Sequence, residues 1–228
     1  MNRKILVIFS SIVMLLPLSG FYLNGTLTNL IKLEYINSDN VLSDINSSIK
    51  NGDLIFQTSV SSQSKAIQLA TKSKYSHCGI IYQNGKDFYV FEAIQPVKLT
   101  LLSTWINRGK DGKYVIKRLK NGDKLLTPPV ISKMKNVGER FKGKNYDLTF
   151  EWSDDKIYCS ELIWKIYKEA TGLEIGRLQK LKDFDLTNPV VKTKMRERYG
   201  NNIPLNEPVI SPEAVFNSNL LITVKSNE

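Results

Sequence analysis

Histidine and cysteine are scarce in this sequence. Its 228 residues include one histidine, His77, and two cysteines, Cys78 and Cys159. So few ligands exclude a zinc site of the usual spacing, because such a site takes several His or Cys residues at short intervals. The acidic residues form no metal-ligand motif, and no Gly-rich phosphate loop is present. We therefore expect neither a metal nor a cofactor.

Repeats, low-complexity tracts and nucleic-acid-binding motifs are also absent. Hydrophobic residues make up 42% of the chain and charged residues 24%, as in globular proteins, and the length suits one domain of ordinary size. The formal net charge of +10 comes from scattered lysines and arginines, so no nucleic-acid partner is expected. This excess suits either a solvated surface or contact with anionic envelope polymers and lipid head groups.

The chain begins with the pattern of an export signal. Arg3 and Lys4 precede a long uncharged apolar run, which is typical of a secretory signal peptide. Pro17 favours cleavage, but no clear A-x-A cleavage pattern follows, so a retained membrane anchor is the alternative. We predict an exported protein of the periplasm or cell envelope, with a signal peptide or anchor over 1–23 and a connector over 24–50.

The remaining chain has the pattern of a small antiparallel sheet followed by helices. Strands are expected at five short apolar runs, several with two-residue alternation: 54–56, 75–82, 88–93, 97–101 and 113–119. Helices are expected where apolar residues recur at three- and four-residue spacing: 61–72, 128–143 and 159–172. The basic stretch 188–199 is also helix-like. We predict an α+β domain over 51–216 that includes a C-terminal cap, followed by a tail over 217–228.

The scarce residues suggest a nucleophile and its base. Cys159 opens a predicted helix, and His77 enters a predicted strand beside a hairpin. A helix N-terminus and a neighbouring imidazole both favour the thiolate, which is the reactive form of cysteine. We expect the segment 153–155, Ser-Asp-Asp, to cap this helix. Backbone N–H groups near Cys159 and Ser160 would then point toward the thiolate and toward an oxyanion formed on a bound carbonyl.

Glu92 and Cys78 complete the candidate set. Glu92 ends the second hairpin strand, where side-chain alternation can place its carboxylate on the face of His77 and orient the imidazole. Cys78 follows His77 directly and is expected to face the core, away from Cys159. A disulfide between the two cysteines would contradict a Cys159–His77 pair, so we expect two free thiols and an inert Cys78. Taken singly, each of these residues also suits a structural role.

Longer blocks of sequence carry a family resemblance. Five of them, 51–56, 75–79, 90–93, 143–147 and 158–162, are similar to the YiiX/YebB-like permuted members of the NlpC/P60 superfamily, and the similarity extends over 51–216. The resemblance implies a circularly permuted papain-like core in which the histidine precedes the cysteine. It implies Cys159 and His77 as the catalytic dyad, Glu92 as the third polar residue, and Tyr146 and Tyr158 as cleft residues.

The resemblance implies thiol-mediated acyl transfer without choosing the acyl donor. Members of the superfamily cleave amide bonds in cell-wall peptides, while relatives of the permuted branch act on lipid acyl groups. We expect an exported amidase or cysteine peptidase that acts on murein peptide, with Tyr146, Tyr158 and Ser160 in substrate binding. The alternatives are a lipid acyl hydrolase or acyltransferase at the membrane surface, and a non-catalytic envelope binding protein.

The partner implied by these readings is a peptide or lipid-linked envelope substrate, with peripheral or N-terminal association with the membrane. A glycosidase would need a pair of catalytic carboxylates. Asp53, Asp154 and Asp155 are the candidates for that pair, but the first opens a strand and the other two precede a helix. The thiol mechanism is therefore preferred.

Overall fold

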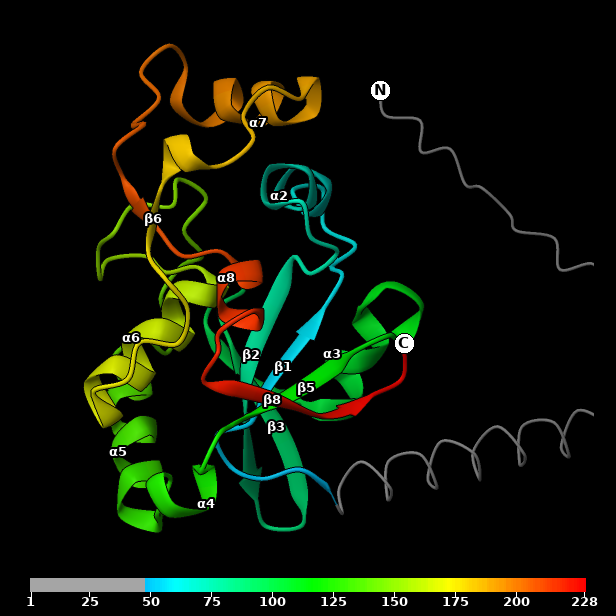
Figure 1. Ribbon diagram of the computed structural model, residues 1–228, viewed down its shortest axis with the longest axis vertical. Helices are drawn as coiled ribbons and strands as arrows, with labels where there is room; N and C mark the ends of the chain where they lie inside the picture. Colours follow the sequence, from blue (N-terminus) through cyan, green and yellow to red (C-terminus); the bar gives the residue numbers. More distant parts are fainter. Residues whose placement is uncertain (1–47) are drawn as a thin grey trace, which may run out of the picture. The chain divides into compact units, whose positions relative to one another are not determined.

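A six-stranded antiparallel sheet lies at the centre of the structure (Figure 1), a computed structural model that describes residues 48–228. The strands are ordered β4-β3-β2-β1-β5-β8. Their bounds are Leu54–Gln57 (β1), His77–Asn84 (β2), Asp87–Glu92 (β3), Lys98–Leu101 (β4), Val115–Leu119 (β5) and Leu221–Ser226 (β8). The signal peptide or anchor predicted over 1–23 and the connector predicted over 24–50, except for residues 48–50, lie outside the described residues.

Helices cover both faces of the sheet. On one face α6 (Cys159–Thr171) packs on β2, and α5 (Pro128–Glu139) packs beside α6. On the other face α3 (Leu102–Arg108) packs on β3. Because successive strand residues point to opposite faces, β2 contributes Ile80 to the core under α6 and Ile81 to the core under α3.

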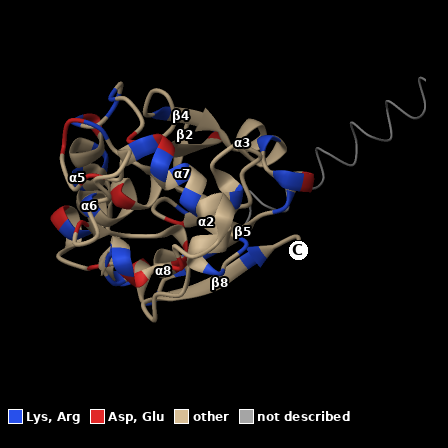
Figure 2. Ribbon diagram, turned by 90° about the horizontal axis from the view of Figure 1, so that it is seen from above, with Lys and Arg blue, Asp and Glu red and all other residues tan. Residues whose placement is uncertain are grey.

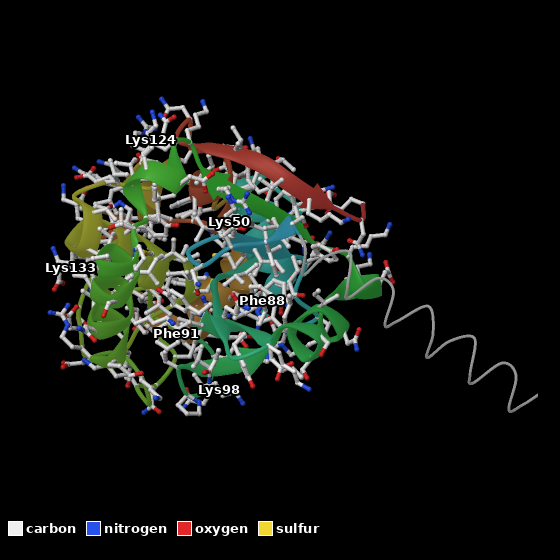
Figure 3. The ribbon with its side chains drawn as sticks, turned by 90° about the horizontal axis from the view of Figure 1, so that it is seen from below. Lys50, Phe88, Phe91, Lys98, Lys124 and Lys133 are labelled. Carbon is white, nitrogen blue, oxygen red and sulfur yellow. The ribbon has the colours of Figure 1, made fainter. Side chains whose placement is uncertain are left out.

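The β3 strand shows the same alternation. Phe88 and Phe91 are both buried, Phe88 in the core under α3 and Phe91 in the core under α6. Figure 3, viewed from the end of the sheet opposite to α7, shows both rings among packed side chains, whereas Lys98, Lys124 and Lys133 project at the periphery. The hairpin of β2 and β3 therefore builds two cores at once.

The other elements gather mainly around the end of the sheet at which β1 ends and β2 begins. There α2 (Ser64–Thr71) packs against α7 (Pro189–Tyr199), as Figure 1 shows. The short α8 (Pro212–Phe216) packs against α6. The smaller elements are α4 (Gly122–Leu125), β6 (Gln179–Lys180) paired with β7 (Pro208–Val209), and 3-10 turns at Lys110–Gly112 and Leu181–Asp183. Within residues 48–228, none of the helices has both the length and the apolar character needed to cross a membrane.

The ends of α6 and α7 follow from local sequence. α6 ends before Gly172, whose φ of 80° lies in the left-handed region that glycine adopts without a steric cost. α7 begins with Pro189 in its first turn, after Asn188. The Asn188 side-chain oxygen accepts a hydrogen bond from the Val190 N–H at 2.9 Å, the usual arrangement of an N-cap. The helix predicted over 188–199 thus has a start specified by its own residues.

The predicted α+β class with a small antiparallel sheet is confirmed, but the predicted end of the domain is wrong. The segment 217–228, expected to be a tail beyond residue 216, contains β8, which pairs with β5 in the central sheet. β8 is an edge strand whose side chains after Leu221 are half-buried or exposed. An edge strand of this kind lacks the regular burial pattern from which central strands are recognised.

Candidate active site

His77 and Glu92 meet on neighbouring strands. His77 is the first residue of β2 and Glu92 the last residue of β3. His77 Nε2 lies 2.5 Å from Glu92 Oε2, and the Glu92 side chain is fully buried. The imidazole also stacks on the Trp105 ring of α3, with ring centroids 5.8 Å apart. The bond to Glu92 sets the orientation of the ring and leaves Nδ1 as the nitrogen that faces another partner.

Three more side chains bind the Glu92 carboxylate. The Thr100 hydroxyl of β4 donates to Oε1 at 2.5 Å, while Trp105 Nε1 and Arg108 Nη2, both from α3, donate to Oε2 at 2.9 and 2.5 Å. Burial by itself would raise the pKa of Glu92. The bond to His77 with its positive charge, the bond from Thr100 and the charge of Arg108 lower that pKa to about 2. Glu92 is therefore a fixed anion.

Cys159 lies next to His77, on the side of the ring away from Glu92. It is the first residue of α6 and is buried against the start of β2. Its sulfur lies close enough to the His77 ring and to the thiol and backbone N–H of Cys78 to interact with all three. Because Glu92 holds Nε2, Nδ1 of His77 is the nitrogen that faces the sulfur. The structure thus brings the three residues of the predicted triad together.

The charges of these groups support one another. The hydrogen bond from Cys78 and, against the effect of burial, the bond to His77 and its positive charge hold the pKa of the Cys159 thiol well below its usual range. Burial by itself would lower the pKa of His77, but hydrogen bonds to Cys159 and Glu92 and the charges of both raise it to about 9. These shifts favour a thiolate, an imidazolium and a carboxylate at neutral pH.

Cys78 lies closer to Cys159 than the sequence predicts. It is fully buried and faces the core as expected, but that core is the one that α6 closes, so its thiol reaches the sulfur of Cys159. Both cysteines in the described part of the chain are free thiols. Burial raises the pKa of Cys78 well above its usual range, so Cys78 stays protonated and donates to Cys159.

The predicted cap of α6 is wrong. The N-cap position is held by Tyr158, because a capping residue must directly precede the helix and the segment 153–155 ends too early. Asp154 Oδ1 instead accepts a hydrogen bond from Lys165 Nζ at 2.7 Å, and the Ser153 carbonyl accepts one from the same amine at 2.6 Å. These residues tie the preceding loop to the side of α6.

The three residues predicted for substrate binding line one cavity together with Cys159. Two of them also hold α6 to the segment that precedes α8. The Ile210 N–H donates to the Tyr158 hydroxyl at 3.1 Å, and the Ser160 hydroxyl donates to the Ile210 carbonyl at 2.8 Å. The third residue, Tyr146, lies in the loop before α6. Its hydroxyl accepts a hydrogen bond from Gln63 Nε2 at 3.1 Å.

This cavity is almost entirely apolar. It is partly open to solvent and lies among α2, α7 and the start of α6. Apolar side chains of α2 and α7 form much of its wall: Ala66, Ile67, Ala70, Val191 and Met195. Lys194 and Arg198 of α7 also contribute to the lining, and Figure 2, which looks onto α7 and α2, shows basic positions on both helices.

Several residues of the site were not predicted. Thr100, Trp105 and Arg108 bind Glu92, while Gln63 and Arg198 lie on the path to Tyr146. None belongs to a motif with a chemical signature, and α3, which carries two of them, was not recognised as a helix. The one available signal is Glu92 itself, because a buried carboxylate needs hydrogen-bond donors around it.

Comparisons with known proteins identify the family of this fold. A family model described as permuted papain-like amidase enzyme, YaeF/YiiX, C92 family, matches residues 48–225. The chain is 53% identical over 173 residues to the uncharacterized protein YiiX of Escherichia coli strain K12, covering 76% of this chain and 84% of that protein. A crystal structure described as metalloprotein yiiX from Escherichia coli O157:H7 matches with a TM-score of 0.75 and 52% identity, over 79% of this chain and 98% of that one. The protein therefore belongs to the C92 family of permuted papain-like amidases, YaeF/YiiX.

Proposed function

We propose that the protein hydrolyses an amide bond through Cys159, His77 and Glu92, and that the acyl group it removes is apolar. The observation that carries the chemistry is the cluster of Cys159, His77 and Glu92: the Cys159 sulfur interacts with the His77 ring, and His77 Nε2 lies 2.5 Å from Glu92 Oε2. A thiolate beside an imidazolium is an activated nucleophile. Membership of an amidase family supports the amide as the bond that is cleaved.

The steps follow from the resting charges. The Cys159 thiolate attacks the carbonyl carbon, and the C–N bond breaks as the His77 imidazolium gives its Nδ1 proton to the leaving amine. The acyl group is then held on Cys159 as a thioester. Neutral His77 takes a proton from a water molecule whose oxygen attacks the thioester, which releases the acid and restores the thiolate and imidazolium. Glu92 keeps the ring in place and balances its charge throughout.

We assign two donors to the oxyanion that forms during both attacks. The Cys159 N–H belongs to the first residue of α6, where backbone donors have no acceptor within the helix. The Tyr146 hydroxyl lines the same cavity as Cys159. Burial and the charge of Cys159 raise the pKa of Tyr146 well above its usual range, so the hydroxyl keeps its proton. Donors aimed at developing charge supply a large part of enzymatic rate enhancement.

The cavity beside Cys159 supports an aliphatic acyl group. Its wall gives apolar contacts along α2 and α7 but few polar partners. A polar peptide group placed there would lose hydrogen bonds to water without replacing them, whereas an alkyl chain would gain from burial. The lipid alternative therefore has more support than murein peptide, which stays a prediction. An exported location, also a prediction, would place either substrate within reach.

A metal plays no part in this proposal, although the relative from Escherichia coli O157:H7 is described as a metalloprotein. Within residues 48–228, no group of three or more His, Cys, Asp or Glu side chains is arranged to hold a metal ion. The residues present therefore do not fit a metal site. We expect hydrolysis to be unchanged by a chelator such as EDTA, and activity that is lost on chelation and restored by a metal would contradict this.

A series of fluorogenic anilides that differ only in acyl chain length, from acetyl through hexanoyl to decanoyl, tests the proposed substrate class. We expect kcat/KM of the full chain to rise with chain length and to vanish in Cys159→Ala. Purified murein peptides, analysed by mass spectrometry in parallel, form the second arm. Release of murein fragments without turnover of any acyl anilide would reject the apolar acyl group, and identical results for both proteins would reject Cys159 as the nucleophile.

A further inference from the structure

A chain of hydrogen bonds connects the last turn of α7 to the active site. Arg198 Nη2 donates to Gln63 Oε1 at 2.7 Å, and Gln63 Nε2 donates to the Tyr146 hydroxyl at 3.1 Å. Gln63 immediately precedes α2, and Tyr146 lies in the loop before Cys159. Three segments that are distant in the sequence therefore converge on one hydroxyl beside the nucleophile.

The chemistry of these groups sets the direction of every bond. An arginine can only donate, so the Gln63 oxygen must face Arg198 and its amide nitrogen must face Tyr146. That nitrogen can also only donate, so the Tyr146 oxygen accepts, and the hydroxyl hydrogen is left to point elsewhere. Tyr146 lines the cavity with Cys159, so the hydrogen can point to the acceptors beside it, which are the Cys159 thiolate before reaction and the developing oxyanion during it.

Arg198 is itself held in place. Its guanidinium lies over the Phe150 ring, 4.9 Å from the ring centroid, an arrangement that favours a cation. The next residue, Tyr199, donates its hydroxyl to the Thr149 carbonyl in the same loop. The end of α7 is therefore fastened to the loop that carries Tyr146, and the path from Arg198 to Tyr146 is not a loose surface contact.

We propose that Gln63 and Arg198 are positioning residues that force the Tyr146 hydroxyl to donate its hydrogen toward the oxyanion. This inference rests on the proposed function, in which Tyr146 is an oxyanion donor. It adds that α7 contributes to catalysis through Arg198 as well as forming a wall of the cavity. The C-terminal cap then belongs to the active site.

The substitution Gln63→Glu tests this proposal, because it changes the direction of one bond and little else. A glutamate keeps the contact with Arg198 as an ion pair, but it accepts from Tyr146 and so turns the phenol hydrogen away from the oxyanion. We expect kcat on the decanoyl anilide to fall about tenfold or more, with KM nearly unchanged. Gln83→Glu, the same change at an exposed position of β2, serves as the matched control and should behave as the parent protein.

Two further readouts separate positioning from a structural role. Decanal forms a thiohemiacetal with Cys159 whose oxygen occupies the oxyanion position, so its inhibition constant should rise about tenfold in Gln63→Glu. Alkylation of Cys159 by iodoacetamide forms no oxyanion, and its rate should stay the same.

Combined variants test the same pathway. In a Tyr146→Phe background, Gln63→Glu should lower kcat no further, because both changes remove the same interaction. Arg198→Met should lose activity, and Arg198→Lys, which can also only donate, should restore part of it.

Each outcome decides the inference. If Gln63→Glu has the same kcat and the same affinity for decanal as the parent protein, the inference is wrong. It is also wrong if Gln63→Glu lowers kcat further in the Tyr146→Phe background, or if Gln63→Glu slows the alkylation of Cys159 by iodoacetamide. If the parent protein binds decanal but hydrolyses no anilide, the proposed substrate is wrong while the decanal comparison still tests Gln63. If the parent protein neither binds decanal nor hydrolyses an acyl substrate, the proposed function fails, and this inference fails with it.

Discussion

Two anionic groups flank His77 and favour its protonated form. Its ring contacts the Cys159 sulfur on one side and Glu92 on the other, and these contacts raise its pKa to about 9. Glu92 in turn stays ionised because its carboxylate accepts hydrogen bonds from Thr100, Trp105 and Arg108. A single histidine in the chain is thus tuned by neighbours from β3, β4, α3 and α6.

The pH dependence of hydrolysis should report the raised pKa of His77. The leaving amine needs the His77 proton, so kcat/KM should be level through neutral pH and fall as pH rises through about 9. Alkylation by iodoacetamide needs only the Cys159 thiolate and should not fall there. In Glu92→Gln, which removes one anion, the upper limit should move to lower pH. A parental profile that already falls near pH 6.5, the ordinary range of histidine, would contradict the assigned charges.

At the scale of elements, a helix or strand can be predicted from the sequence when its apolar residues recur at a regular spacing. The hairpin of β2 and β3 and the helices α5 and α6 were predicted because apolar residues recur at the spacing of each structure. α3 and β8 were not predicted. α3 is too short to show a clear helical spacing and follows β4 directly, and β8 lies at the edge of the sheet. Cys159 and His77 were predicted because they are rare and chemically distinctive. Arg108 and Arg198 were not, because their roles depend on contacts that exist only in the folded chain.

The first turn of α6 contains a buried carboxylate besides Cys159. Glu161 is fully buried, with Oε1 at 2.8 Å from Lys165 Nζ. Burial raises the pKa of Glu161 to about 8, although Lys165 opposes the shift. Between about pH 4.5 and 8 the unfolded chain has released this proton and the folded chain still holds it. Stability is therefore lost as pH rises through this window.

Chemical denaturation of Glu161→Gln should show this effect. We expect the free energy of unfolding of the parent protein to fall between about pH 5 and 8, and the glutamine variant to lack most of that decline, because glutamine does not titrate. A pKa difference of one unit corresponds to about 1.4 kcal/mol, so the difference in slope is measurable. Glu169→Gln, at a half-exposed position of the same helix, is the matched control. Parallel pH profiles for Glu161→Gln and the parent would contradict the assigned charge state.

At the scale of the whole molecule, the parts that close the cavity come from opposite ends of the domain. α2 follows the first strand and α7 precedes the last one, yet they pack together over the start of α6. The site is thus formed by the central sheet together with the C-terminal cap. This arrangement explains why Cys159, His77 and Glu92 could be proposed from the sequence, while the shape and polarity of the cavity beside Cys159 could not.

Filling the cavity should change the preferred chain length. Ala70 lies on α2 in the cavity wall, and Ala70→Phe would occupy space that a long acyl chain needs. We expect kcat/KM for the decanoyl anilide to fall about tenfold while that for the acetyl anilide stays nearly unchanged, because only the long chain needs the space that the ring fills. Ala93→Gly, a buried change outside this cavity, controls for lost stability. Equal losses on both substrates would argue against acyl binding in this cavity.

Trapping the acyl-enzyme is the most direct test of the central claim. The full chain is mixed with decanoyl anilide, quenched in acid at short times and analysed by intact-protein mass spectrometry with peptide mapping. We predict one decanoyl group on Cys159, none on Cys78, longer persistence of the adduct in Glu92→Gln, and no adduct in Cys159→Ala. Hydrolysis that proceeds in Cys159→Ala, or an acyl group found only at another residue, would contradict the account.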